Sequence, residues 1–137
     1  MLYILDVGTH NSMTYSLGDV PIGGVEGWAQ NQYASLEDQL RMGIRFLDIR
    51  LRHVGDHFKI HHGEFYTGYD LGDVLDVVTE FLDKNENETV LISYQKADTE
   101  GKTNKTFCET LESYIYQVKG GYLQEKSECM LAILALT

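Results

Sequence analysis

Segments with the patterns of strands and helices mostly alternate along this chain, and their order limits the choice of fold. Short apolar runs predict strands over residues 1–7, 44–52, 58–62 and 89–94. Capping residues and apolar positions three or four apart predict helices over residues 35–42, 71–83 and 106–118. A long polar loop is expected over residues 9–27, and a strand or helical turn over residues 130–136. Alternation of this kind is typical of an α/β fold with a parallel sheet.

The length of the chain narrows this prediction further. A complete (β/α)8 barrel typically needs about 250 residues, and this chain has 137. About four or five strands are predicted. The chain is therefore interpreted either as a small open α/β sheet or as part of a barrel.

The charge and the absence of several motifs exclude some functions. A net charge of −10 argues against a nucleic-acid partner and against simple adsorption to anionic lipid, although a local pocket could still bind a membrane lipid. No apolar run reaches the ~18 residues of a membrane span, and no signal peptide is recognised. Cys108 is expected to be an apolar filler in a helix, and a disulfide with Cys129 is the less favoured alternative.

Polar side chains stand near the predicted ends of three strands. His10 follows the first strand, Asp48 and Arg50 lie on one face of the second, and His62 ends the third. Two imidazoles can take and give a proton, and a guanidinium can hold a phosphoryl oxygen. This set suits attack of a hydroxyl group on a phosphodiester. A loop histidine, a structural ion pair and a half-exposed strand end are the alternatives, and spacing alone does not exclude them.

Four segments occur in an order that is highly specific in combination: GTHNSMTY, QNQYASLEDQLRMGIRFLDIRLR, KIHHGEFY and FLDKNENETVLISYQK. Together they resemble the catalytic X region of phosphatidylinositol-specific phospholipase C, especially its bacterial, metal-independent branch. The resemblance covers residues 3–97 and fades toward residue 125. It implies a partial TIM (β/α)8 barrel comprising about the first four or five strands.

The resemblance also implies a role for each residue of the candidate site. His10 is expected to be the general base for the inositol 2-hydroxyl, and His62 the general acid for the diacylglycerol oxygen. Arg50 is expected to bind the phosphate, supported by Asp48. The expected products are diacylglycerol and inositol 1,2-cyclic phosphate. Arg50 stands where calcium-dependent relatives carry an acid, so neither a metal nor another cofactor is expected. By strand parity, His62 is expected to point into the barrel with Phe58 and Ile60, and His61 outward toward a helix.

Three departures from the family pattern put activity in question. Asn11 and Gln95 are expected to contact substrate, but they stand where the bacterial enzymes carry an aspartate and a lysine. Lys96 has the opposite strand parity and is expected to point away. The family barrel is about twice this length, and its later strands normally supply an aspartate that pairs with the general base. Residues 1–125 are accordingly predicted to be a partial X domain, and residues 126–137 an apolar tail outside the family pattern.

Three hypotheses follow for the function. The first is a phosphodiesterase that acts on phosphatidylinositol or a related lipid at a membrane surface. The second is a catalytically impaired, truncated family member that binds a phosphate head group or a partner without turnover. The third is a truncation that does not fold alone. An open barrel edge would favour self-association. Frequent secretion of family relatives suggests a secreted or membrane-peripheral protein, although the sequence itself leaves localisation undetermined.

Overall fold

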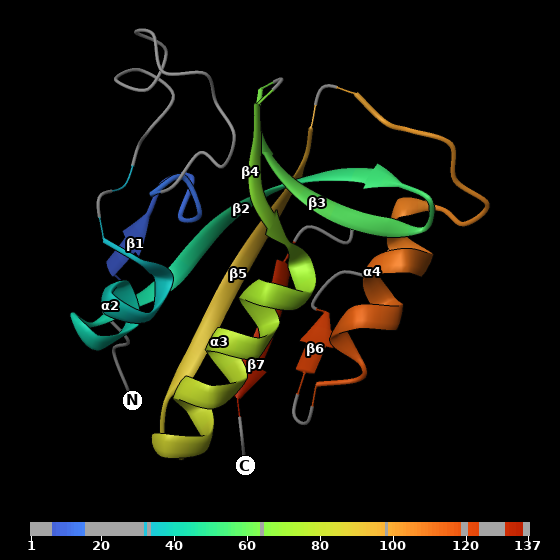
Figure 1. Cartoon of the computed structure of the whole chain (residues 1–137). Coiled ribbons are helices and arrows are strands. Elements are labelled where there is room, and N and C mark those ends of the chain that lie inside the picture. The colour runs from blue at the N-terminus through green and yellow to red at the C-terminus, as the bar shows by residue number, and fades with distance from the viewer. Residues whose placement is uncertain are drawn as a thin grey trace, which may run out of the picture.

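The computed structural model describes residues 7–15, 32, 34–63, 65–97, 99–118, 121–123 and 131–135 (Figure 1). In chain order the elements are β1 (Val7–Thr9), α2 (Leu36–Arg41), β2 (Ile44–Val54), β3 (His57–His62), β4 (Phe65–Asp70), α3 (Leu71–Lys84), β5 (Thr89–Lys96), α4 (Phe107–Ile115), β6 (Gly121–Leu123) and β7 (Leu131–Ala135). Most of the first predicted strand and of the predicted loop over residues 9–27 lies outside the described residues. The described part is a mixed α/β fold whose sheet curls into part of a barrel, as predicted.

The strands of the described residues form one sheet in the order β4-β3-β2-β5-β7-β6, and β1 pairs with the beginning of β2. β1, β2 and β5 are parallel to one another. β3 runs antiparallel to both β2 and β4, and β7 runs antiparallel to β5. The sheet is therefore mixed, and the prediction of an essentially parallel sheet is corrected. As a consequence, β3 returns from the end of β2 toward its middle.

The helices begin at, or within one residue of, the starts that the sequence predicts, and each one follows a capping residue. The Ser35 side chain accepts a hydrogen bond from the backbone N–H of Asp38 at the start of α2 (3.1 Å). Asp70 and Thr106 each form a capping box with the residue at the third helical position of α3 and α4. These side chains satisfy N–H groups that have no partner inside the helix. The local sequence therefore fixes where each helix starts against the sheet.

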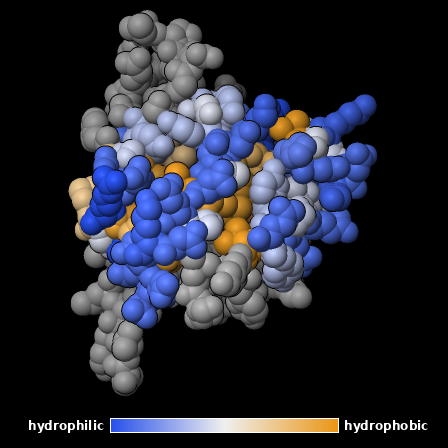
Figure 2. All heavy atoms as spheres, turned by 60° about the horizontal axis from the view of Figure 1, so that its bottom comes forward, coloured by the Kyte–Doolittle hydropathy of each residue, from blue (hydrophilic) through white to orange (hydrophobic). Residues whose placement is uncertain are grey.

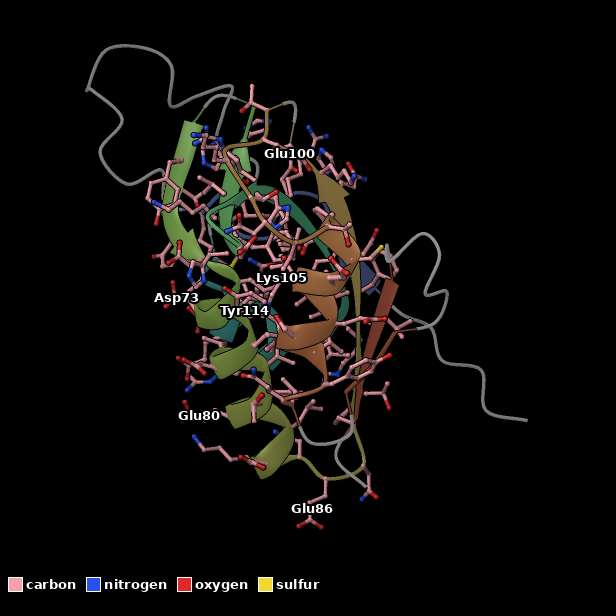
Figure 3. All side chains as sticks on the ribbon, turned by 90° about the vertical axis from the view of Figure 1, so that its right-hand side faces the viewer. Asp73, Glu80, Glu86, Glu100, Lys105 and Tyr114 are labelled. Atoms are coloured by element: carbon pink, nitrogen blue, oxygen red, sulfur yellow. The ribbon has the colours of Figure 1, made fainter. Side chains whose placement is uncertain are left out.

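The core lies between α3 and α4 and one face of the sheet. That face carries the buried apolar side chains of β2, β3 and β5, namely Leu47, Ile49, Leu51, Phe58, Ile60, Val90, Ile92 and Tyr94. The ring of Phe58 contacts Phe107 and Tyr114 of α4, with centroids 4.8 and 5.8 Å apart. Figure 3 shows Tyr114 on α4, beside α3. Phe58 and Ile60 therefore point toward the helices, and the expectation that their face points into the barrel is wrong.

On the face shown in Figure 2, hydrophilic residues cover much of the surface, with hydrophobic residues visible between them. This distribution is consistent with a net charge of −10. None of the helices in the described ranges is long and apolar enough to cross a membrane. Cys108 on α4 is disulfide-bonded, which corrects the expectation of an unpaired apolar filler. Cys129 lies outside the described residues.

Candidate active site

A tight turn after β1 carries His10 and is held against the middle of β2. The backbone N–H of Ser12 donates to the carbonyl of Asp48, and the N–H of Asp48 donates to the Ser12 hydroxyl (both 3.0 Å). Asn11 has a φ of 45°, in the left-handed region that asparagine tolerates better than most residues. The turn therefore fixes His10 and Asn11 directly beside Asp48.

Gln39 of α2 connects the helix to this turn. Its side chain is 1% exposed. Its Nε2 donates to the carbonyls of Ser12 (2.8 Å) and Ala34 (2.9 Å), and its Oε1 accepts from the Thr9 hydroxyl (2.7 Å). Gln39 was not predicted from the sequence as part of the site. The signal was a polar side chain within the apolar stripe of a helix, between Leu36 and Leu40, where burial requires hydrogen-bond partners.

His10, Asn11 and Asp48 are in direct contact. Nδ1 of His10 lies 2.8 Å from Oδ2 of Asp48, which also accepts from the backbone N–H of Asn11 (3.2 Å). An ionised carboxylate only accepts hydrogen bonds, so Nδ1 of a neutral His10 is the N–H donor. Nε2 then carries the lone pair, and the Asn11 side-chain amide lies 3.0 Å from it. The imidazole is 63% exposed and the carboxylate 11%, so a buried acceptor orients an accessible basic nitrogen.

Arg50 lies two residues beyond Asp48 on the same face of β2. Its Nε is buried without a hydrogen-bond partner, and among the described residues no carboxylate pairs with its guanidinium. Oδ1 of Asp48 is also buried without a partner. Gln95 is the parallel-strand partner of Arg50, so the two side chains share one face, and Gln95 is exposed. An unpaired guanidinium beside an exposed amide can bind an oxyanion.

His62 ends β3 and is half-buried. Ile60 pairs with Leu51, so the antiparallel strand carries His62 back toward the level of Arg50 and Asp48. The β3–β4 pairing is irregular between Lys59 and His61, and Ile60 and His61 are both buried. Strict alternation therefore stops at this point, and strand parity does not fix the direction of His62.

Two residues beside the site were predicted to point away from it. The His61 ring contacts the Tyr66 ring of the adjacent strand β4, with centroids 5.5 Å apart. Lys96 was expected to point away from the site. Its Nζ lies 5.1 Å from the ring centroid of Phe107 on α4, so it is on the helix side of the sheet, as predicted.

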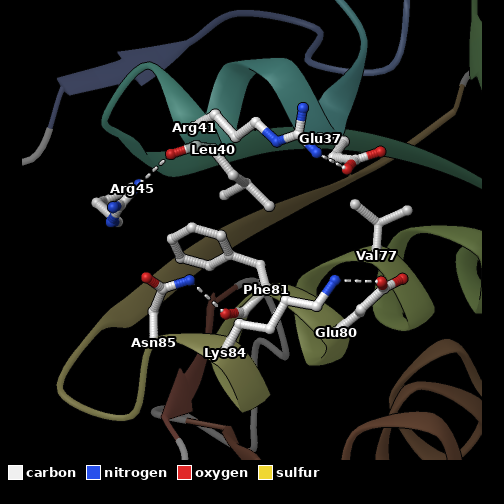
Figure 4. A pocket seen from close by; sticks show the side chains of 9 residues that line it. All are labelled: Glu37, Leu40, Arg41, Arg45, Val77, Glu80, Phe81, Lys84 and Asn85. Carbon is white, nitrogen blue, oxygen red and sulfur yellow. Dashed lines mark hydrogen bonds and ion pairs between the residues drawn. The ribbon is translucent and has the colours of Figure 1, made fainter.

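A separate cavity of about 300 Å3 lies between α2 and α3 (Figure 4). Its apolar lining consists of Leu40, Val77 and Phe81. Arg41 pairs with Glu37 and Lys84 pairs with Glu80 at its rim, so these charges are already compensated. None of the predicted site residues lines it. Within the described ranges, no group of three or more His, Cys, Asp or Glu side chains is arranged to hold a metal ion.

The curled sheet, with a histidine–carboxylate pair and an arginine beside the ends of parallel strands, defines part of an α/β barrel of the phospholipase C type. The family model described as "Phosphatidylinositol-specific phospholipase C, X domain" matches residues 7–131. This chain belongs to that family.

Curated and structural relatives agree with this assignment. The chain is 37% identical over 111 residues to a Staphylococcus aureus protein named "1-phosphatidylinositol phosphodiesterase", covering 80% of this chain and 35% of the relative. A Listeria monocytogenes protein of the same name is 37% identical over 108 residues, covering 79% and 32%.

Solved phosphatidylinositol-specific phospholipases C have the same fold. A double mutant from S. aureus superposes with a TM-score of 0.72 at 32% identity, covering 85% of this chain and 40% of that chain. The L. monocytogenes structure gives a TM-score of 0.62 at 29% identity, covering 84% and 40%. The chain therefore spans about one third of the length of these curated relatives.

Proposed function

We propose that this chain carries the acid–base and phosphate-binding residues of a phosphodiesterase that cleaves phosphatidylinositol. The observation that carries the proposal is the hydrogen bond between His10 Nδ1 and Asp48 Oδ2 (2.8 Å), which leaves Nε2 as the basic nitrogen. The relatives named 1-phosphatidylinositol phosphodiesterase support the substrate class. Arg50, on the same strand face, supports binding of an anionic phosphodiester.

The reaction proceeds by internal transfer at phosphorus. Nε2 of His10 takes the proton of the inositol 2-hydroxyl, and the resulting oxygen attacks phosphorus. The guanidinium of Arg50 stabilises the charge on the non-bridging oxygens. The bond between phosphorus and the diacylglycerol oxygen breaks, and the imidazolium of His62 protonates that oxygen. The products are diacylglycerol and inositol 1,2-cyclic phosphate.

Asp48 is proposed to position the base within this segment. Its carboxylate holds the Nδ1–H tautomer and stabilises the imidazolium that forms when Nε2 takes the proton. An aspartate from later strands is therefore not required to orient His10. The Asn11 amide, 3.0 Å from Nε2, must move aside when the hydroxyl binds. Because Asn11 is neutral, it supports the imidazolium less than an aspartate would.

The second hypothesis, binding without turnover, keeps specific support. The chain covers only about a third of its curated relatives, and the Asn11 amide occupies the basic nitrogen of His10. In that case Arg50 binds a phosphate head group, and no bond at phosphorus is broken. Phosphate binding that depends on Arg50 but yields no cyclic product would favour this hypothesis.

Variants at the two histidines test the proposed roles. Turnover of a soluble inositol phosphodiester should fall by about 10²–10⁴ in His10→Ala and in His62→Ala, the usual contribution of one general acid or base. The control is His57→Ala, because His57 is an exposed histidine at the start of β3. Unchanged turnover in both site variants would refute the assigned roles.

Asp48→Asn tests the positioning role separately. It should reduce turnover, and it should change the ¹⁵N signature of the His10 ring from the Nδ1–H tautomer to a mixture of tautomers. If the tautomer stayed fixed in Asp48→Asn, another group would be orienting the base.

A further inference from the structure

Two cations near the candidate site lack the carboxylate partners that several other cations have. Among the described residues Arg41, Arg45 and Lys84 each lie within ion-pair distance of a glutamate. Over the same ranges Arg52 and Lys59 pair with no carboxylate, although Asp and Glu outnumber Lys and Arg by 21 to 11 in the whole chain. Within the described residues Arg50, Lys96, Lys102 and Lys105 have no carboxylate within ion-pair distance either. The feature of Arg52 and Lys59 that calls for an explanation is therefore their placement relative to each other.

Strand register places these two cations side by side. Arg52 of β2 is directly opposite Lys59 of β3 in the antiparallel pair, so both side chains lie on one face. Arg52 is two residues beyond Arg50, so it shares that residue's face as well. The neighbouring His53 points the other way, toward Phe107 of α4 (ring centroids 6.1 Å apart). Three cations therefore occupy the face of the sheet opposite α4.

This arrangement is unfavourable unless an anion compensates it. Like charges directly opposite each other on a sheet are destabilising. Nε of Arg52 is also buried without a hydrogen-bond partner, which is costly for a donor that water cannot reach. Lys59 keeps its ammonium exposed, with Nζ 5.2 Å from the ring centroid of Tyr66. A bound oxyanion would satisfy the Arg52 donor and neutralise both charges.

We propose that Arg52 and Lys59 form a second phosphate-binding site beside Arg50. The proposal rests on the proposed function, in which Arg50 holds the phosphodiester that reacts. Arg52 offers the planar fork of donors that fits phosphate oxygens, and Lys59 adds a point charge. Positions two residues apart on a strand are separated by about 6.6 Å, so two phosphates can be held at once. The second phosphate is either a substituent of the same head group or a separate phosphate group.

Titration of the 137-residue chain with three probes distinguishes these sources. The probes are myo-inositol 1-phosphate, a myo-inositol bisphosphate that also carries the 1-phosphate, and inorganic phosphate, all at one ionic strength. If the second phosphate belongs to the head group, the bisphosphate should bind about tenfold more tightly than the monophosphate, the gain from one additional charged hydrogen bond. Arg52→Gln and Lys59→Gln should each reduce this difference and leave monophosphate binding unchanged.

A separate phosphate gives a different result. The two inositol phosphates then bind equally, and inorganic phosphate binds to the parent chain and to Arg50→Gln but much less to Arg52→Gln. The matched control is Lys84→Gln, which removes one positive charge at the far end of α3. The proposal is overturned if Arg52→Gln and Lys59→Gln bind all three probes as Lys84→Gln does. The role proposed for Arg50 can fail separately. In that case Arg50→Gln would bind the monophosphate as the parent chain does, and Arg52→Gln would still weaken binding of the second phosphate.

Discussion

Replacement of Gln39 by leucine tests whether α2 holds the turn that carries the base. The side chain is 1% exposed and makes three hydrogen bonds, to the Ser12 and Ala34 carbonyls and to the Thr9 hydroxyl. Leucine makes none of them. An unsatisfied buried polar group costs about 1–3 kcal/mol. The bond to Ser12 is fully buried and contributes most, and the bonds to Ala34 and Thr9 are partly buried and contribute less. The free energy of unfolding should therefore fall by about 2–5 kcal/mol.

Such a loss would be a large part of the roughly 5–15 kcal/mol that stabilises a typical domain. Urea unfolding followed by far-UV circular dichroism measures it. The matched control is Gln117→Leu, because Gln117 is exposed after α4. The control should change the free energy of unfolding by less than about 0.5 kcal/mol. An equally small change in Gln39→Leu would refute the reasoning.

The same variant should also disturb His10. Gln39 reaches Ser12, whose backbone and hydroxyl are bonded to Asp48. In NMR spectra recorded under native conditions, the His10 ring resonances of Gln39→Leu should therefore broaden or shift, and those of Gln117→Leu should not. Unchanged His10 resonances in a destabilised but folded Gln39→Leu chain would show that the contact stabilises the fold without positioning the base.

Three further changes probe the scaffold. Thr110→Val should lower the free energy of unfolding in urea by about 1–3 kcal/mol. The substitution removes the hydroxyl that lies 2.8 Å from Nε2 of the buried His53. An unchanged free energy of unfolding would mean that another group replaces the hydroxyl. Gly101→Ala should lower the melting temperature, because the added Cβ would clash with the side chain of Val54, and adding Val54→Ala should restore part of the loss. Two backbone amides of the loop before α4 donate to the Asp56 carboxylate (2.7 and 2.8 Å) and lower its pKa. A lowered pKa stabilises the fold above the ordinary carboxyl pKa, and this stabilisation is lost as pH falls through the folded value. Below about pH 4, Asp56→Asn should therefore lose less stability on acidification than the parent chain, and an equal loss would contradict this linkage.

Local patterns in the sequence predicted much of the fold. Ser35, Asp70 and Thr106 begin helices because each one supplies a side-chain acceptor for N–H groups that its own helix leaves unpaired. The period of two in β2 predicted that Asp48 and Arg50 share a face, and burial of the intervening apolar residues confirms it. These predictions succeeded because they depend on neighbours in the sequence.

Predictions that depend on distant partners were less accurate. β4 was missed, because Gly68 and Asp70 weaken its strand pattern, and the antiparallel direction of β3 depends on which strand lies beside it. The irregular pairing near His61 ended the alternation from which its direction had been inferred. The bonds from Gln39 to Thr9 and Ser12 join segments about 30 residues apart, and no local pattern specifies them.

Phosphorus NMR of the 137-residue chain with phosphatidylinositol micelles in the presence of EDTA tests the proposed function most directly. We predict a cyclic phosphodiester signal that grows with time in the parent chain and in His57→Ala, but not in His10→Ala. Absence of this signal from a parent chain that circular dichroism shows to be folded would contradict the proposed turnover and would favour phosphate binding without catalysis.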